Sequence, residues 1–266
     1  MPVDCAIEID ALDQERFHAV DKQVMGHAFA IHNTLGRFCD ERIYQEELAR
    51  RCRKSGLDVL REVLLRVSHM DFAKSYYIDM ILERGAAYEL KTVEALSGGH
   101  QRQLINYLLL AGMHHGKLIN LRPASVESRF VSTQLRPSDR AHVIFDDREW
   151  VSVDRGSERL RDILSELFVE WGAFLDVNLY REAIVHFMGG QDAVIRLVPI
   201  EVVGRVVGSQ KMCLLGPDAA WHISALRKHA QSYETHMRRL LKHSPLNRLQ
   251  WINLDQRKVL LKTLEK

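Results

Sequence analysis

Residues 77–91 of this chain read YIDMILERGAAYELK, in which two strand-forming runs flank a turn-forming tripeptide at 83–85. The pattern predicts a β-hairpin centred on that turn. Asp79 and Glu89 are equally distant from the centre, so we expect them to lie opposite each other, with Cβ atoms ~4.5–5.5 Å apart. Lys91 follows Glu89 by two residues and therefore points to the same face of the hairpin.

Two carboxylates and a lysine on one face form a candidate site for a divalent cation and an activated water. Carboxylate oxygens are ligands that hard cations prefer, and a bound cation lowers the pKa of water. The same spacing also suits a solvated strand face that carries a simple salt bridge. Spacing alone therefore leaves both interpretations open.

The segments around the hairpin predict a mixed α/β order. A first helix ends near Gly36, and a polar linker from Pro137 is followed by a hairpin at 142–153 that turns at Asp146-Asp147. Between them we expect helices over 40–54 and 97–113 and strands over 58–68, 74–82, 86–93, 117–121 and 127–135. In the second half, helices are expected over 160–171 and 179–188.

The chain also repeats itself. Residues 35–48, LGRFCDERIYQEEL, align without a gap with residues 171–184, WGAFLDVNLYREAI, and share five identities in 14 positions. A second register, shifted by 133 instead of 136 residues, carries residues 78–121 onto 211–254. Self-similarity of this kind indicates two copies of one structural unit. We therefore predict a tandem duplication, with copies at about 17–135 and 156–266 in domains 1–150 and 151–266.

Four pieces of the first copy resemble a known family. Asp79, nine residues and Glu89-Leu90-Lys91 resemble the D…(D/E)xK core of the PD-(D/E)XK nuclease superfamily. Gln103 to Tyr107 resembles the QxxxY helix motif of its RecB-like members, and Glu41 to Tyr44, after a helix ending in Leu-Gly, resembles the signature of the GxxExxY family. The resemblance covers about residues 27–121. Arg37 and Phe38 depart from it, since they stand where the family usually has Pro-Gly.

The resemblance implies a fold and a reaction. The fold is a restriction-endonuclease-like mixed sheet flanked by helices, and the reaction is Mg²⁺- or Mn²⁺-dependent hydrolysis of nucleic-acid phosphodiester bonds. By resemblance, Asp79, Glu89 and the backbone carbonyl of Leu90 hold the metal. Lys91 orients the attacking water, and Glu41 positions that water or a second metal.

The resemblance also gives a role to one helix. Gln103 and Tyr107 lie four residues apart on the same helix face. They are expected to fix Lys91 or to contact the scissile strand.

The second copy lacks these residues. In the two registers, the six candidate positions carry different side chains: Glu41 meets Val177, Asp79 meets Met212, Glu89 meets His222, Lys91 meets Ser224, Gln103 meets His236 and Tyr107 meets Leu240. Residues that shape the fold, such as Gly36 and Tyr44, are retained as Gly172 and Tyr180. We therefore expect a degenerate pseudo-nuclease repeat that packs on the first copy as an intramolecular pseudo-dimer, in a monomeric or homodimeric protein.

Composition excludes several other classes. The 266 residues are 46% hydrophobic and 27% charged, which are ordinary globular proportions and not those of a disordered chain. No apolar run approaches the ~18 residues of a membrane span, and the first 20 residues do not resemble a signal peptide, so a cytoplasmic location is expected by default. The four cysteines show no CxxC spacing, which argues against a zinc site.

Net charge leaves the partner open. The formal charge of +2 neither demands nor excludes nucleic acid, because a basic groove can occur in a balanced total. The alternative to a nuclease is a non-cleaving nucleic-acid-binding protein or a protein-interaction scaffold that retains the fold.

Overall fold

The computed structural model describes residues 3–152 and 154–266. The chain divides into two compact units, the first ending at Asp139 and the second beginning at Arg140. Each unit is built on a six-stranded mixed sheet with helices packed against it, which is the α/β class that the sequence predicts. The division precedes the expected boundary at residue 150, because the strand at 144–149 pairs within the second sheet.

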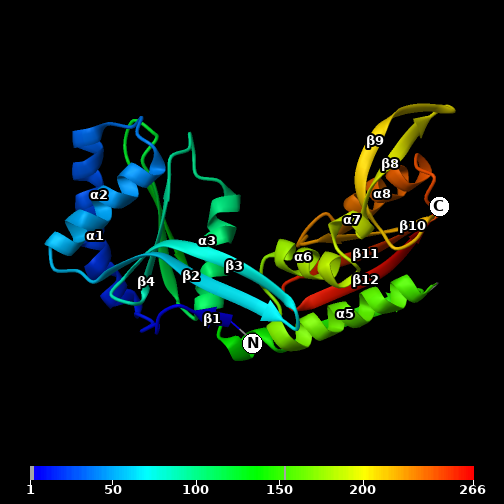
Figure 1. Cartoon of the computed structure of the whole chain (residues 1–266), viewed down its shortest axis with the longest axis horizontal. Helices are drawn as coiled ribbons and strands as arrows, with labels where there is room; N and C mark the ends of the chain where they lie inside the picture. The colour runs from blue at the N-terminus through cyan, green and yellow to red at the C-terminus, as the bar shows by residue number, and fades with distance from the viewer. Residues whose placement is uncertain (1–2, 153) are drawn as a thin grey trace. The chain divides into compact units, whose positions relative to one another are not determined.

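The first unit follows the predicted order of helices and strands (Figure 1). Its sheet has the strand order β1-β2-β3-β4-β5-β6, and only β4 and β5 are parallel, joined by the crossover helix α3. The elements are β1 (Val3–Cys5), α1 (Gln14–Leu35), α2 (Glu41–Lys54), β2 (Val59–His69), β3 (Phe72–Leu82), β4 (Ala86–Lys91), α3 (Gly98–Ala111), β5 (His115–Asn120) and β6 (Glu127–Ser132). The edge strand β1 has no counterpart in the sequence prediction.

The predicted hairpin is formed by β3 and β4. Its turn places Glu83 and Arg84 in the left-handed region, and the N–H of Gly85 donates to the carbonyl of Leu82 at 3.1 Å. Glycine is required at position 85 because a Cβ there would lie 1.9 Å from the carbonyl oxygen of Asp10. The loop before α1 therefore packs directly on the turn and holds it.

The core of the first unit lies between the sheet and the helices α1 and α2. Tyr88 and Leu90 of β4 are fully buried in it, together with Ile31 of α1 and Leu48 of α2. Side chains alternate along a strand, so Glu89, between Tyr88 and Leu90, points to the other face of the sheet. The apolar pattern of β4 thus directs its acidic side chain toward the side that α3 covers.

The second unit has a sheet of strand order β7-β12-β11-β10-β9-β8. Its elements, after the short α4 (Pro137–Arg140), are β7 (Ile144–Glu149), α5 (Arg155–Trp171), α6 (Val177–Phe187), α7 (Gln191–Val194), β8 (Ile195–Val202), β9 (Arg205–Leu214), β10 (Ala219–Ser224), α8 (Ala230–Lys242), β11 (Arg248–Asp255) and β12 (Lys258–Glu265). Among the described residues, no helix is long and apolar enough to span a membrane.

The two units share one topology. The series β8-β9-β10-α8-β11-β12 repeats β2-β3-β4-α3-β5-β6, with the same strand order and the same single parallel pair across the crossover helix. The registers also agree, since Lys91 pairs with Asn120 and Ser224 pairs with Asn253, which is the predicted shift of 133 residues. Shared topology and register support the predicted duplication.

Equivalent side chains make equivalent contacts in the two units. Asn120 donates to the carbonyl of Val93 at 2.7 Å, and Asn253 donates to the carbonyl of Leu226, the corresponding residue, at 3.0 Å. In each case the asparagine also accepts from the N–H of that same residue. These bonds fix the loop between the first parallel strand and the crossover helix in both units.

A second matched contact closes the first helical corner. Gly36 ends α1 at φ 70° and Gly172 ends α5 at φ 73°, a left-handed φ that favours glycine. The hydroxyl of Tyr44 donates to the carbonyl of Gly36, and the hydroxyl of Tyr180 donates to that of Gly172. The tyrosine therefore ties the second helix of each unit to the end of the first.

We expect Tyr44→Phe to lower the free energy of unfolding by about 1 kcal/mol, because it removes a buried hydrogen bond and leaves its partners unpaired. Urea denaturation measures the difference. The matched control is Tyr77→Phe, at a tyrosine that is 53% exposed, and we expect it to leave stability unchanged. Equal stabilities of Tyr44→Phe and wild type would contradict a structural role for this contact.

The predicted hairpin at 142–153 is wrong. The segment forms the single strand β7, which pairs in parallel with the edge strand β12, and Asp146 and Asp147 lie inside it instead of at a turn. The two aspartates form ion pairs with Arg148 and Arg161, which offsets their poor strand propensity. An open sheet edge distant in sequence thus overrode the local turn signal.

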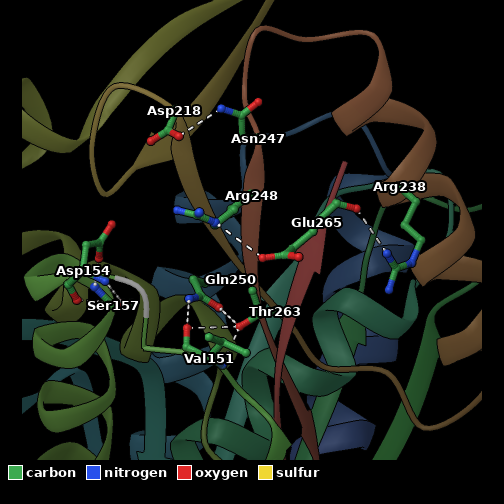
Figure 2. A network of polar contacts seen from close by, with 10 residues as sticks. All are labelled: Val151, Asp154, Ser157, Asp218, Arg238, Asn247, Arg248, Gln250, Thr263 and Glu265. Carbon is green, nitrogen blue, oxygen red and sulfur yellow. Dashed lines mark hydrogen bonds and ion pairs between the residues drawn. The ribbon is translucent and has the colours of Figure 1, made fainter.

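Polar contacts hold the end of this segment against the sheet (Figure 2). The N–H of Val151 donates to Thr263 at 2.8 Å, and the carbonyl of Val151 accepts from Gln250 at 3.0 Å. Thr263 and Gln250 are themselves bonded at 2.7 Å across β12 and β11. The extra strand of the second unit is therefore anchored at the β12 edge, whereas the extra strand of the first unit, β1, pairs with β2 at the opposite edge.

Candidate active site

The candidate site lies where the strands of the β3–β4 hairpin diverge. The backbone ladder runs from Leu82–Ala86 to Met80–Tyr88 and stops there, so Asp79 and Glu89 occupy the first opposed position beyond it. The N–H of Asp79 donates to Glu89 Oε1 at 3.1 Å, and the N–H of Leu90 donates to Asp79 Oδ2 at 2.8 Å. Each carboxylate thus bonds to the backbone of the opposite strand.

Lys91 completes the cluster. Its Nζ donates to Glu89 Oε2 at 3.0 Å and lies 4.0 Å from Asp79 Oδ2. The exposed fractions of the side chains are 13% for Lys91, 15% for Asp79 and 2% for Glu89. The three residues that the hairpin pattern predicts to share a face therefore form one largely buried network.

The pKa values of both acids are raised. Burial is the largest cause for Asp79, and it outweighs the opposing effects of Lys91 and of the Leu90 N–H. For Glu89, burial acts first and the charge of Asp79 adds to it. Burial alone would lower the pKa of Lys91, but Glu89 and Asp79 raise it, so the lysine is cationic. Two buried acids share a single lysine, which favours a further positive charge at this position.

Glu41 is the first residue of α2, and its contribution is electrostatic. Its negative charge raises the pKa values of both Asp79 and Lys91. Among the described residues, no three His, Cys, Asp or Glu side chains converge as a group that could hold a metal. Glu41 therefore does not join Asp79 and Glu89 as a close third ligand.

Two carboxylates are a suitable donor set for Mg²⁺. In proteins this ion is commonly held by one or two carboxylates and keeps several of its waters. The buried pair, with one lysine for two acids, fits that chemistry.

Sequence reasoning missed one acidic residue beside the site. Glu62 of β2 lies opposite Asp79, between the paired positions Arg61–Met80 and Val63–Ile78, and its charge raises the pKa of Asp79. Its φ is 48°, an unfavourable left-handed conformation for a residue other than glycine. Counting back from the turn at 69–71 would have placed Glu62 opposite Asp79.

Helix α3 brings the QxxxY residues to the same face of the sheet. Gln103 donates to the hydroxyl of Tyr107 at 2.9 Å, and Tyr107 contacts the ring of Tyr76 edge-on at 5.8 Å. Burial raises the pKa of Tyr107, and the charge of Glu89 raises it further. Among the described contacts, Gln103 bonds to Tyr107 and not to Lys91. The pair thus lies within electrostatic reach of the acidic cluster.

A mixed sheet of this topology, with two acids and a lysine where its central strands diverge, defines a restriction-endonuclease-like protein. Residues 18–131 match the family model of the PD-(D/E)XK nuclease superfamily. That match runs from α1 to β6 and includes every candidate residue described above. No curated protein and no solved structure matches the chain.

The corresponding position of the second unit has no carboxylates. Met212 and His222 stand where the first unit has Asp79 and Glu89. The ring of His222 is hydrogen-bonded to the hydroxyl of Tyr233 at 2.7 Å, and burial lowers its pKa. Ser224, in place of Lys91, donates to Asn253 at 2.8 Å. The acidic cluster is therefore replaced by a neutral network.

Proposed function

We propose that the first unit is a nuclease that hydrolyses phosphodiester bonds of nucleic acid with Mg²⁺ or Mn²⁺. The observation that carries the proposal is the buried network of Asp79, Glu89 and Lys91, whose two acids share one lysine. The match of residues 18–131 to a nuclease superfamily supports the same reaction class. The second unit, in this proposal, is a pseudo-nuclease repeat that supports the first without cutting.

Asp79 and Glu89, with the backbone carbonyl of Leu90, would hold the metal. When bound, the ion supplies a Lewis acid that polarises the phosphate and lowers the pKa of a nearby water. The protein's own residues orient the reactants. The ammonium group of Lys91, held by Glu89 at 3.0 Å, is placed to donate a hydrogen bond to the attacking water and to offset the charge that develops on the phosphate.

The surrounding helices supply the remaining roles. Glu41 extends the negative field toward Asp79 and is placed to accept a hydrogen bond from the water. The Gln103–Tyr107 pair covers the same face of the sheet, where its polar atoms can orient the scissile strand. In this arrangement, Glu62 adds negative charge and so strengthens the preference for a cation.

Lys91→Ala is the direct test. We expect purified protein with Mn²⁺ to cleave DNA or RNA, and Lys91→Ala to reduce the rate by about 10²–10³-fold, because one donor to the transition state is lost. Lys22→Ala, at an exposed lysine of α1, is the matched control and should cleave like wild type. Circular dichroism checks that both variants fold. Absence of cleavage by wild type on single- and double-stranded substrates of both kinds would favour the non-cleaving alternative.

A further inference from the structure

The second unit contains a cavity at the position that the acidic cluster occupies in the first. Its volume is about 430 Å³, within the range of ~300–1,000 Å³ that is typical of small-ligand sites. The β9–β10 ladder stops at the pair Cys213–Trp221, and the next opposed residues, Met212 and His222, line the cavity. The diverging strands that accommodate the carboxylates in the first unit therefore leave a cavity in the second.

Two cations line this cavity. Arg181 of α6 and Lys211 of β9 both contribute to its wall, and no Asp or Glu does. Among the described residues neither forms an ion pair, and the side-chain partner of Arg181 is the thiol of Cys213. Both side chains are exposed at the cavity, so an anionic ligand can reach them without first displacing a carboxylate.

These cations are specific to the second unit. In the same registers that align the two units, Arg181 stands where the first unit has Gln45, and Lys211 stands where it has Ile78. Both of those residues are buried and neutral. The second unit has thus lost two acids and gained two cations around one position of the fold, which reverses the sign of the charge that the position favours.

The remaining wall offers a surface for a planar ring. The rings of His222 and Tyr233 are stacked, with centroids 5.8 Å apart and planes inclined by 28°. Met212 and Leu240 add apolar contact area beside them. The buried indole Nε1–H of Trp221, which also belongs to the wall, has no hydrogen-bond partner among the described residues. Aromatic side chains of this kind are the usual platforms for nucleic-acid bases.

We propose that this cavity binds a nucleotide. Its phosphate would contact Arg181 and Lys211, since guanidinium and ammonium groups are the side chains that recognise phosphate. Its base would lie against the His222–Tyr233 pair. The nucleotide can be free in solution or part of a strand, because both present the same phosphate and base. The proposal does not depend on cleavage by the first unit.

Calorimetric titration of the full chain in EDTA tests the proposal without metal-dependent chemistry. The probes are thymidine 5′-monophosphate, a ten-nucleotide oligothymidylate and inorganic phosphate. We expect at least one nucleotide probe to bind, and the double variant Arg181→Gln/Lys211→Gln to weaken that binding at least tenfold. Because both residues are exposed, the variant should fold normally, which circular dichroism verifies.

Two controls make the outcome specific. Arg239→Gln changes an exposed cation of α8 that does not line the cavity, and it should alter binding by less than twofold. Lys91→Ala should bind nucleotide like wild type even though it disables the proposed nuclease. Binding of the oligonucleotide but not of the monophosphate assigns the ligand to a strand, and comparable binding of both assigns it to a free nucleotide.

Three results would overturn the proposal. They are no binding of either nucleotide probe, unchanged binding by the double variant, and inorganic phosphate binding as tightly as the nucleotides. The last result would mean that the aromatic wall contributes nothing to recognition.

Discussion

Asp79→Asn is expected to abolish Mn²⁺-supported cleavage, with a loss of roughly 10³-fold or more. The asparagine amide oxygen can still accept from the Leu90 N–H, so the hairpin keeps its geometry. What is lost is one of two negative charges available to a cation. Changes to residues that only support metal ligands already cost about 10–100-fold, and removal of a direct ligand should cost more. The measurement is the cleavage rate at saturating Mn²⁺.

The same variant should lose its thermal response to metal. Wild type is expected to gain stability on addition of Mn²⁺, by about 2.7 kcal/mol at a hundredfold excess over the dissociation constant, because the ion binds the folded state. Asp79→Asn should show almost no gain. Asp58→Asn changes an exposed aspartate of the same unit, 48% exposed, and serves as the matched control. An identical melting-temperature change in wild type and Asp79→Asn would contradict the metal site.

The stability of the metal-free protein should fall as the pH rises from about 4 to 8. The pKa of Asp79 is raised to about 6 and that of Glu89 to about 7, above the ordinary values of 3.8 and 4.5. A group with a raised pKa in the folded state binds its proton more tightly there than in the unfolded chain. Its contribution is therefore complete below the unfolded pKa and is lost as the pH passes through the folded pKa. The loss is about 1.4 kcal/mol for each pH unit that separates the folded pKa from the unfolded pKa.

Metal binding should show the opposite trend with pH, because a cation competes with these protons. The Mn²⁺-induced increase in melting temperature is expected to be small at pH 5 and to grow up to pH 8. Urea denaturation and thermal melts at a series of pH values, with and without Mn²⁺, measure both effects. The double variant Asp79→Asn/Glu89→Gln should remove most of the pH dependence in each. A flat profile in wild type would mean that the two acids do not titrate as a buried pair.

Short-range patterns predicted the essential part of the candidate site. Asp79, Glu89 and Lys91 lie within one hairpin, so their relation depends on a turn of three residues and on the alternation of a strand, both of which are local. The spacing of Gln103 and Tyr107 is likewise a property of one helix. Local geometry does not change with the environment of the hairpin, which is why the cluster was predictable before any fold was known.

The repeat allowed the topology of the second unit to be predicted as well. Its strands could be aligned with those of the first because glycine and tyrosine at the first helical corner, Gly36 with Tyr44 and Gly172 with Tyr180, recur at a constant separation. These positions are constrained by backbone conformation and by a buried hydrogen bond, so they keep their identity where surface residues vary.

Long-range pairing determined what the sequence patterns missed. The segment at 144–149 joined an open sheet edge more than 100 residues away along the chain, although its two aspartates indicated a turn. The position of Glu62 beside Asp79 depends on the register of a neighbouring hairpin. The cavity of the second unit exists because β9 and β10 diverge around Met212 and His222 while Arg181 approaches from a separate helix.

By itself, then, the sequence determined the order of elements, the repeated unit and the acid–acid–lysine cluster, since each depends on residues close together in the chain. Only the tertiary structure decided which edge β7 joins, how deeply Asp79 and Glu89 are buried and that cations gather at the second site. Those features depend on which distant surfaces remain available for pairing and on how completely they exclude water. Neither quantity is encoded in the spacing of neighbouring residues.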